Sequence, residues 1–151
     1  MSDIVLLDTS IYLNVLDVPG FNQERANVIA GFEGCIANND HFLLPLAAVW
    51  ETGKHISQLA DGHHRLAYAE KLTTDVQSAF AGEQPYAPTH FPDREEFRVW
   101  LTSFPDAAMR ALSLADHSLV QEWERSCNLN PQRRVRIWSL DGQLVAYDRG
   151  P

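Results

Sequence analysis

Cysteine is scarce in this sequence: its 151 residues include only two, Cys35 and Cys127. They form no C-x-x-C pair, and a small domain held together by disulfides would carry more of them. We therefore expect two reduced, mostly buried thiols, as is usual in a cytoplasmic protein. The Cys/His spacing of a zinc site is also missing, so we expect His55, His63 and His64 at the surface.

Long apolar runs are missing too. No stretch approaches the roughly 20 residues that a membrane-spanning helix needs. Residues 1–4 lack the basic and apolar regions with which a signal peptide begins. These absences predict a cytoplasmic protein with no membrane partner. The hydrophobic fraction of 45% is nevertheless ordinary for a globular chain, and it predicts a single domain over residues 1–151.

Basic residues are few, with 12 Lys and Arg against 20 Asp and Glu, a net charge of -8. A general nucleic-acid-binding protein usually has a basic face, so this balance argues against one. The objection weakens if several carboxylates surround divalent cations, because each bound cation reverses the local sign of the charge. Non-specific affinity for RNA would be weak, and binding would depend on local basic residues.

Apolar runs alternate with helical patterns along the chain. Residues 4–7, 41–46 and 135–139 are short and apolar, which predicts strands. Helical spacing of apolar residues follows the first two runs and precedes the third, so we expect an α/β fold with a mainly parallel sheet. The segment 61–104 is expected to be a helical excursion from this core, with an irregular stretch at 81–92.

Three further expectations concern the second half of the chain. Pro105 is predicted to separate a helix over 93–104 from another helical stretch that ends at Leu112. One more short element is predicted at 144–147. Asp148 is assigned to a disordered tail, with a reserve role as a metal ligand.

Four acids lie at or near the predicted strand ends. Asp8 directly follows the first strand, and Asp141 follows the last strand by one residue. Glu51 lies one turn into the helix after the second strand, and Asp116 opens a later helix. Because reactive groups gather at the carboxyl ends of parallel strands, we expect these four carboxylates to meet at one edge of the sheet.

Four ionised carboxylates in one place repel one another unless a cation lies between them. Mg²⁺ and Mn²⁺ are hard cations that bind oxygen ligands together with water. Next to a phosphodiester, such an ion can activate water, orient the phosphate and neutralise developing charge. The pattern therefore predicts a hydrolytic nuclease with Mg²⁺ or Mn²⁺ as its cofactor.

Four segments, in their order along the chain, resemble the PIN-domain family. They are the apolar strand with Asp-Thr-Ser at 4–10, the proline and helical glutamate at 44–51, the acidic segment 113–120 and the Ser-x-Asp at 138–141. The resemblance implies a three-layer α/β/α sandwich with a mainly parallel central sheet. It also implies an endoribonuclease that depends on Mg²⁺ or Mn²⁺ and leaves a 5′-phosphate. The metal-binding and catalytic residues that it implies are Asp8, Glu51, Asp116 and Asp141.

Small stand-alone members of this family include VapC-like toxin ribonucleases, which a small antitoxin protein neutralises. The resemblance therefore implies an RNA substrate and an antitoxin partner, and it leaves room for a homodimer. Two features depart from the toxin pattern. Gly142 and Leu144 replace the usual acid and phenylalanine after the last aspartate, and the excursion at 61–104 is long.

Further residues are candidates for supporting roles. Ser10 and Ser139 could support the site, Ser139 by holding Asp141 or a bound water. The candidate RNA contacts are Lys54, one turn past Glu51, and Arg133 and Arg134 in the densest basic patch.

Plain structural readings remain open for the same residues. Asp8 and Asp116 could be helix caps, and Asp141 with Gly142 is a turn signal. Glu51 could pair with a basic residue one turn later, and the arginines could protect a strand edge. Two other functions also stay open: a catalytically silent PIN-like scaffold that binds a protein partner, and a metal-dependent DNA nuclease on the same site.

Overall fold

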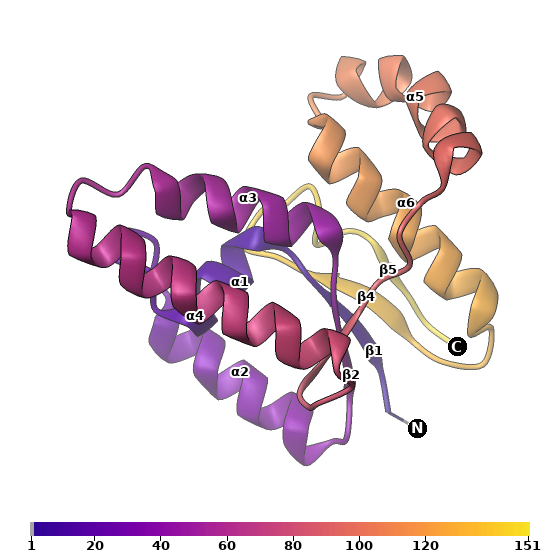
Figure 1. Ribbon diagram of the computed structural model, residues 1–151. Coiled ribbons are helices and arrows are strands. Elements are labelled where there is room, and N and C mark those ends of the chain that lie inside the picture. Colours follow the sequence, from indigo (N-terminus) through magenta and orange to yellow (C-terminus); the bar gives the residue numbers. More distant parts are fainter. Residues whose placement is uncertain (1) are drawn as a thin grey trace.

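The computed structural model describes residues 2–151, and in that range the chain has five strands and six helices (Figure 1). In chain order they are β1 (Ile4–Leu7), α1 (Thr9–Leu16), α2 (Arg25–Ala37), β2 (His41–Leu44), α3 (Leu46–Ser57), α4 (Gly62–Phe80), β3 (Tyr86–Pro88), α5 (Arg94–Met109), α6 (Leu114–Leu129), β4 (Val135–Trp138) and β5 (Asp148–Arg149). The fold is therefore α/β, as the alternating patterns predict.

The strands form one sheet in the order β3-β2-β1-β4-β5. β1 is central and pairs in parallel with β2 and β4, so that Ile4 lies opposite His41 on one side and Val135 on the other. β3 continues the parallel series beyond β2, and β5 is antiparallel to β4. The prediction of a mainly parallel sheet is confirmed.

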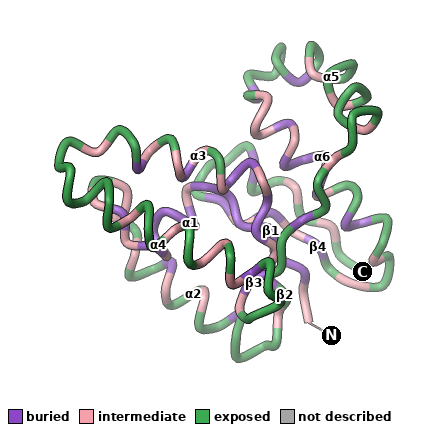
Figure 2. Tube along the Cα trace, in the orientation of Figure 1, coloured by how far each residue is buried: buried purple, intermediate pink, exposed green. Residues whose placement is uncertain are grey.

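Helices cover both faces of the sheet, with α1–α4 on one face and α5 and α6 on the other (Figure 1). Val5 and Leu7 belong to the core under α1–α4, whereas Ile4 and Leu6 belong to the core on the opposite face. Both sets are buried, and Figure 2 shows the buried colour along β1. A strand covered on both faces needs apolar residues at every position, which explains the unbroken apolar run. The layers are consistent with an α/β/α sandwich.

The segment 61–104 is not only a helical excursion. It contains α4 and the start of α5, but Tyr86–Pro88 between them form β3 and pair with β2. The sequence expectation of an irregular stretch is wrong there, because three residues on a sheet edge carry too weak a pattern to detect. Pro88 is tolerated because an edge strand need not donate every backbone hydrogen bond.

One continuous helix, α5, runs through Pro105, so the predicted break is wrong. A capping box of Asp93 and Glu96 stabilises its first turn. Ala107, after the proline, is fully buried in the core that α5 shares with α6. We infer that capping and packing together outweigh the cost of about 3 kcal/mol for a proline inside a helix.

The last residues also differ from expectation. Residues 144–147 form turns rather than a regular element, and Asp148 lies in β5 instead of a disordered tail. Arg134 Nε donates to Asp148 Oδ1 at 2.8 Å, which helps to fix this end of the chain. Cys35 and Cys127 are free and buried, as predicted. Within residues 2–151, no helix is both long and apolar enough to cross a membrane.

Candidate metal centre

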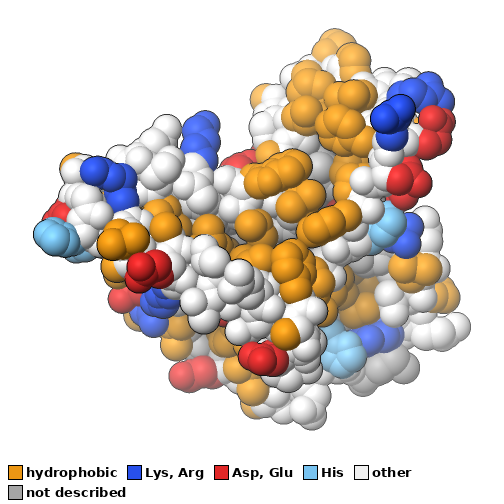
Figure 3. All heavy atoms as spheres, viewed as in Figure 1, with side chains coloured by type: hydrophobic (Ala, Val, Ile, Leu, Met, Phe, Trp, Pro, Cys, Tyr) orange, Lys and Arg blue, Asp and Glu red, His pale blue; other side chains and the backbone are white. Residues whose placement is uncertain are grey.

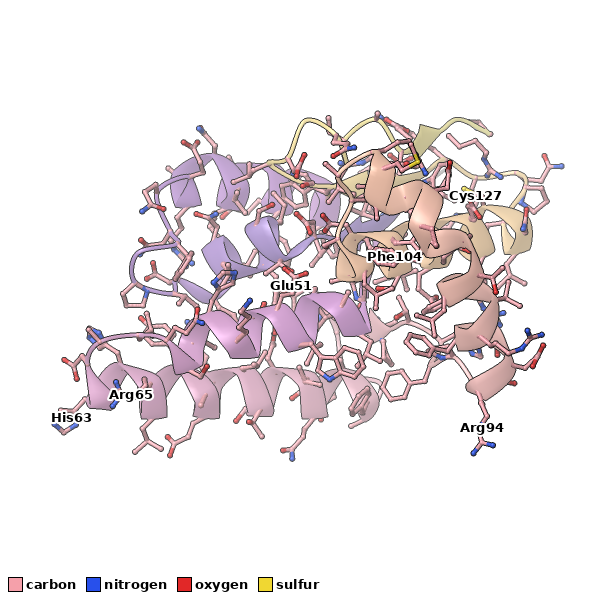
Figure 4. The ribbon with its side chains drawn as sticks, turned by 90° about the horizontal axis from the view of Figure 1, so that it is seen from above. Glu51, His63, Arg65, Arg94, Phe104 and Cys127 are labelled. Carbon is pink, nitrogen blue, oxygen red and sulfur yellow. The ribbon has the colours of Figure 1, made fainter. Side chains whose placement is uncertain are left out.

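All four predicted carboxylates line one pocket of about 390 Å³ at the carboxyl edge of the sheet. Asp8 connects β1 to α1, and Asp141 follows β4. Asp116 lies in the first turn of α6. This helix begins at the carboxyl edge of the sheet, because its other end leads to the start of β4 at the opposite edge. Glu51 projects from the side of α3 turned away from α4 (Figure 4). The structure thus brings together acids that are up to 133 positions apart, from 8 to 141.

Two serine hydroxyls hold Asp8. Ser10 Oγ donates to Asp8 Oδ2 at 2.8 Å, and Ser139 Oγ donates to the same oxygen at 2.7 Å. Asp8 is only 8% exposed, and its side chain makes no capping hydrogen bond to α1. Asp8 thus occupies the N-cap position of α1, but its side chain does not cap the helix. Within residues 2–151 its other oxygen, Oδ1, accepts no hydrogen bond.

The same hydroxyls also fix the loop after β4. Ser139 Oγ accepts the backbone N–H of Asp141 at 2.9 Å, and Ser10 Oγ accepts that of Leu140 at 3.0 Å. Each serine thus joins the Asp8 carboxylate to the backbone beside Asp141. Ser139 acts on the backbone of Asp141 and not on its side chain.

Electrostatic coupling is clearest at Glu51 and Asp116. Burial raises the pKa of the Glu51 carboxyl, the charges of Asp116 and Asp8 raise it further, and Lys54 opposes this rise. Burial and the charge of Asp8 likewise raise the pKa of Asp116, against hydrogen bonding with Ser113, and Asp141 adds to the rise. The carboxylates are therefore close enough to disfavour one another's charged forms.

Asp116 and Asp141 have different local partners. Ser113, not Asp116, caps α6, because its Oγ accepts the backbone N–H of Asp116 at 3.0 Å. Asp141 does form the turn that its sequence suggests, since its Oδ1 accepts the N–H of Gln143 at 2.8 Å. Asp141 lines the pocket as well, so the turn and the pocket use the same residue.

The pocket also contains residues that the sequence patterns did not predict as part of the site. The rings of Phe21 and His55 are in contact, with centroids 4.6 Å apart and planes tilted by 47°, and both residues line the pocket. His55 is half-buried there. His63 and His64 are exposed, as predicted. Asn14, only 3% exposed, donates from Nδ2 to the Ser10 carbonyl at 2.8 Å. A polar residue four positions after Ser10, among apolar neighbours, was the available signal.

Arg133 and Arg134 do not lie at this pocket. They directly precede β4, whereas Asp141 follows it, so they occupy the opposite edge of the sheet. Arg133 Nε donates to the Ser2 carbonyl at 3.0 Å, and Arg134 forms ion pairs with acids on neighbouring segments. β4 pairs with β1 on one side and with β5 on the other, so the two arginines do not protect an open strand edge, and that alternative is wrong as well. Lys54 is exposed and does not line the pocket, although its charge acts on Glu51.

The pocket offers carboxylate oxygens as ligands for a divalent cation. Among residues 2–151, no three or more His, Cys, Asp or Glu side chains form a group that could hold a metal ion as they stand. Mg²⁺, however, is commonly bound by one or two carboxylates and keeps several waters. Carboxylate oxygens are also the ligand type that Mg²⁺ and Mn²⁺ prefer. By its chemistry, the pocket suits either ion.

Comparisons with family models, with curated proteins and with solved structures give no match to this chain.

Proposed function

We propose that the protein is a Mg²⁺- or Mn²⁺-dependent endoribonuclease with a PIN-like fold. The observation that carries this proposal is the pocket in which Asp8, Glu51, Asp116 and Asp141 meet. Burial and mutual repulsion raise the pKa of two of these acids. Acids perturbed in this way, inside a pocket, are typical of functional sites, and a cation would relieve the repulsion.

The chain's own residues suggest a division of roles. Asp8 is the best-fixed ligand, since the two serines occupy Oδ2 and leave Oδ1 available. A cation beside Glu51 and Asp116 would favour their ionised forms against the burial and repulsion that raise their pKa values, and Asp141 would complete the set. A bound Mg²⁺ or Mn²⁺ would activate water and offset the charge of the phosphate. This chemistry requires no protein nucleophile.

The pocket also constrains how a substrate binds. None of its lining residues in the described part of the chain is Lys or Arg. RNA is a polyanion, so its attraction to the pocket would come from bound cations. The rings of Phe21 and His55, which lie in contact at the pocket, offer an aromatic surface on which a nucleobase could stack.

The biological role that the resemblance implies is also part of the proposal: a toxin neutralised by a small antitoxin. The four matching segments support it. Expression of this chain alone should arrest bacterial growth, and the Asp116→Asn variant should not. Growth arrest by the parent chain and by Asp116→Asn alike would show that toxicity does not depend on the carboxylate site.

Cleavage of a fluorescent single-stranded RNA tests the activity. With Mn²⁺ we expect products carrying a 5′-phosphate, and with EDTA we expect none. Asp116→Asn should lower the rate by about 100-fold or more, because a metal ligand is lost. Asp106→Asn, at an exposed aspartate on α5, is the matched control and should cleave at the parental rate.

Three outcomes decide between the alternatives. Cleavage by Asp116→Asn at the parental rate would overturn the assignment of these carboxylates as the active site. Faster cleavage of single-stranded DNA than of RNA would make the protein a DNA nuclease. A protein that cleaves neither and takes up no Mn²⁺ in calorimetry would be a scaffold.

A further inference from the structure

A second cavity lies between the start of α3 and the helices α5 and α6. Its volume is about 160 Å³, and it shares no residue with the carboxylate pocket. Its walls are almost entirely apolar and include Trp50, Phe97, Trp100 and Leu119. One acid, Glu122 of α6, also lines it.

Glu122 is unusual because it is buried and unpaired. The residue is only 5% exposed, and in the described part of the chain its buried Oε1 has no hydrogen-bond partner. Burial of a carboxylate without a partner is costly. Burial accordingly raises the pKa of Glu122 to about 7.

The charged groups around Glu122 are engaged elsewhere. His90 Nε2 lies 2.7 Å from Glu96 Oε2, and Arg125 lies 4.0 Å from the same oxygen. These two basic residues lower the pKa of Glu122 and Glu96 raises it, but none of the three hydrogen-bonds to it. Glu122 and His90 line both this cavity and a neighbouring one, and within residues 2–151 the Glu122 carboxylate has no ion pair of its own.

The mouth of the cavity is an exposed apolar surface. Trp50 is 69% exposed and Phe97 is 39% exposed. Figure 3 shows hydrophobic side chains gathered across the face between α3 and α5. Large aromatic side chains of this kind are typical of binding sites when they cluster at a surface.

We propose that this cavity binds an organic cation whose ammonium or guanidinium group pairs with Glu122. The volume of the cavity is close to the roughly 150 Å³ of a cavity that accepts benzene. The apolar part of the ligand is therefore about the size of one aromatic ring or one basic side chain. Trp50, Phe97 and Trp100 supply aromatic faces, which attract cations. The carboxylate supplies a charged hydrogen-bond acceptor. A free amine and a Lys or Arg side chain of a polypeptide share this chemistry.

An NMR titration of the whole protein at pH 8 tests the proposal with benzylamine and its neutral counterpart, benzyl alcohol. We expect benzylamine to shift the amide signals of the cavity residues saturably and to bind at least about tenfold more tightly than benzyl alcohol. Glu122→Gln should remove this preference. Glu124→Gln, at an exposed glutamate on the same helix, should keep it. Equal binding of both probes, or a preference that survives Glu122→Gln, overturns the proposal.

A second variant locates the site without altering the acid. Ser118→Leu fills the cavity from the α6 wall and should abolish benzylamine binding, whereas undiminished binding overturns the proposal. The peptide acetyl-Leu-Lys-Leu-amide, compared with its norleucine analogue, identifies the source of the cation. Tighter binding of the lysine peptide than of benzylamine indicates a polypeptide, and the reverse indicates a free amine. Absence of binding by both cations overturns the proposal.

Discussion

Ser139 and Asp8 are joined by a 2.7 Å hydrogen bond although 131 positions separate them in the chain. The bond runs between the ends of two paired strands, since Leu7 of β1 lies opposite Trp138 of β4. The geometry of the candidate metal centre is therefore tied directly to the pairing at the centre of the sheet.

Replacement of Ser139 by alanine should weaken both the fold and the site. The change removes a hydrogen bond to Asp8 and leaves the N–H of Asp141 without its acceptor. We expect the free energy of unfolding in urea to fall by about 1–3 kcal/mol. The affinity for Mn²⁺ should fall by about 10- to 100-fold, as for other residues that orient metal ligands. Ser57→Ala, at an exposed serine, is the control, and equal losses in both variants would contradict this role.

Addition of Mn²⁺ should raise the unfolding temperature in a pH-dependent way. The raised pKa values of Glu51 and Asp116 mean that the folded chain holds these protons more tightly than the unfolded chain. Stability from the protonated forms is present at low pH and is lost as the pH rises through the raised pKa values. Mn²⁺ binds the ionised forms, so its stabilising effect should be larger at pH 7.5 than at pH 4.5.

Differential scanning fluorimetry with and without Mn²⁺ measures this effect. The double variant Glu51→Gln, Asp116→Asn should lose most of the response, and Glu33→Gln, at an exposed glutamate on α2, should retain it. The same Mn²⁺ response in the double variant would mean that the ion binds elsewhere.

Replacement of Glu122 by glutamine should change how stability depends on pH. The folded pKa of about 7 lies above the ordinary value for glutamate, so Glu122 makes the parent protein less stable as the pH rises from about 4.5 to about 7. Glutamine keeps the shape without the charge, so the stability of the variant relative to the parent should rise by about 3 kcal/mol between low pH and pH 8. Urea unfolding at pH 5 and pH 8 measures the difference. A variant that loses stability in parallel with the parent would refute the assignment of this slope to Glu122.

Two glycines of α2 provide a matched pair for the packing of Trp138. A Cβ atom at Gly31 would lie 2.9 Å from the indole ring of Trp138, whereas a Cβ atom at Gly34 would meet nothing within 4 Å. Gly34→Ala should stabilise the protein by about 0.5–1 kcal/mol, because alanine favours a helix. Gly31→Ala should destabilise it, because the indole must move. Thermal unfolding of both variants checks the pair, and equal stabilisation would exclude the close contact.

Much of the central sheet could be predicted from the sequence. The apolar runs at 4–7, 41–46 and 135–139 predict the strands β1, β2 and β4, although β2 ends at Leu44 and β4 at Trp138. The meeting of four acids in one pocket also follows from a general rule, that groups after parallel strands share one edge.

Features that depend on tertiary packing could not be predicted in this way. β3 is three residues long and exists through its pairing with β2, and α5 continues past Pro105 with its last turn packed on the core. His55 joins the pocket through its contact with Phe21, which a sequence pattern does not reveal. Nor does local spacing tell at which edge of the sheet Arg133 and Arg134 lie.

The central strand β1 links correct folding to the chemistry of the pocket. Its alternate residues supply two separate cores, and Asp8 follows at once. A slip of one residue in its pairing with β4 would exchange the two sets of side chains and displace Asp8 by about 3.3 Å from Ser139, which holds it. A chain in the wrong alignment would therefore be both poorly packed and inert. The pairing register of β1 thus determines both the stability of the folded chain and the position of Asp8 in the pocket.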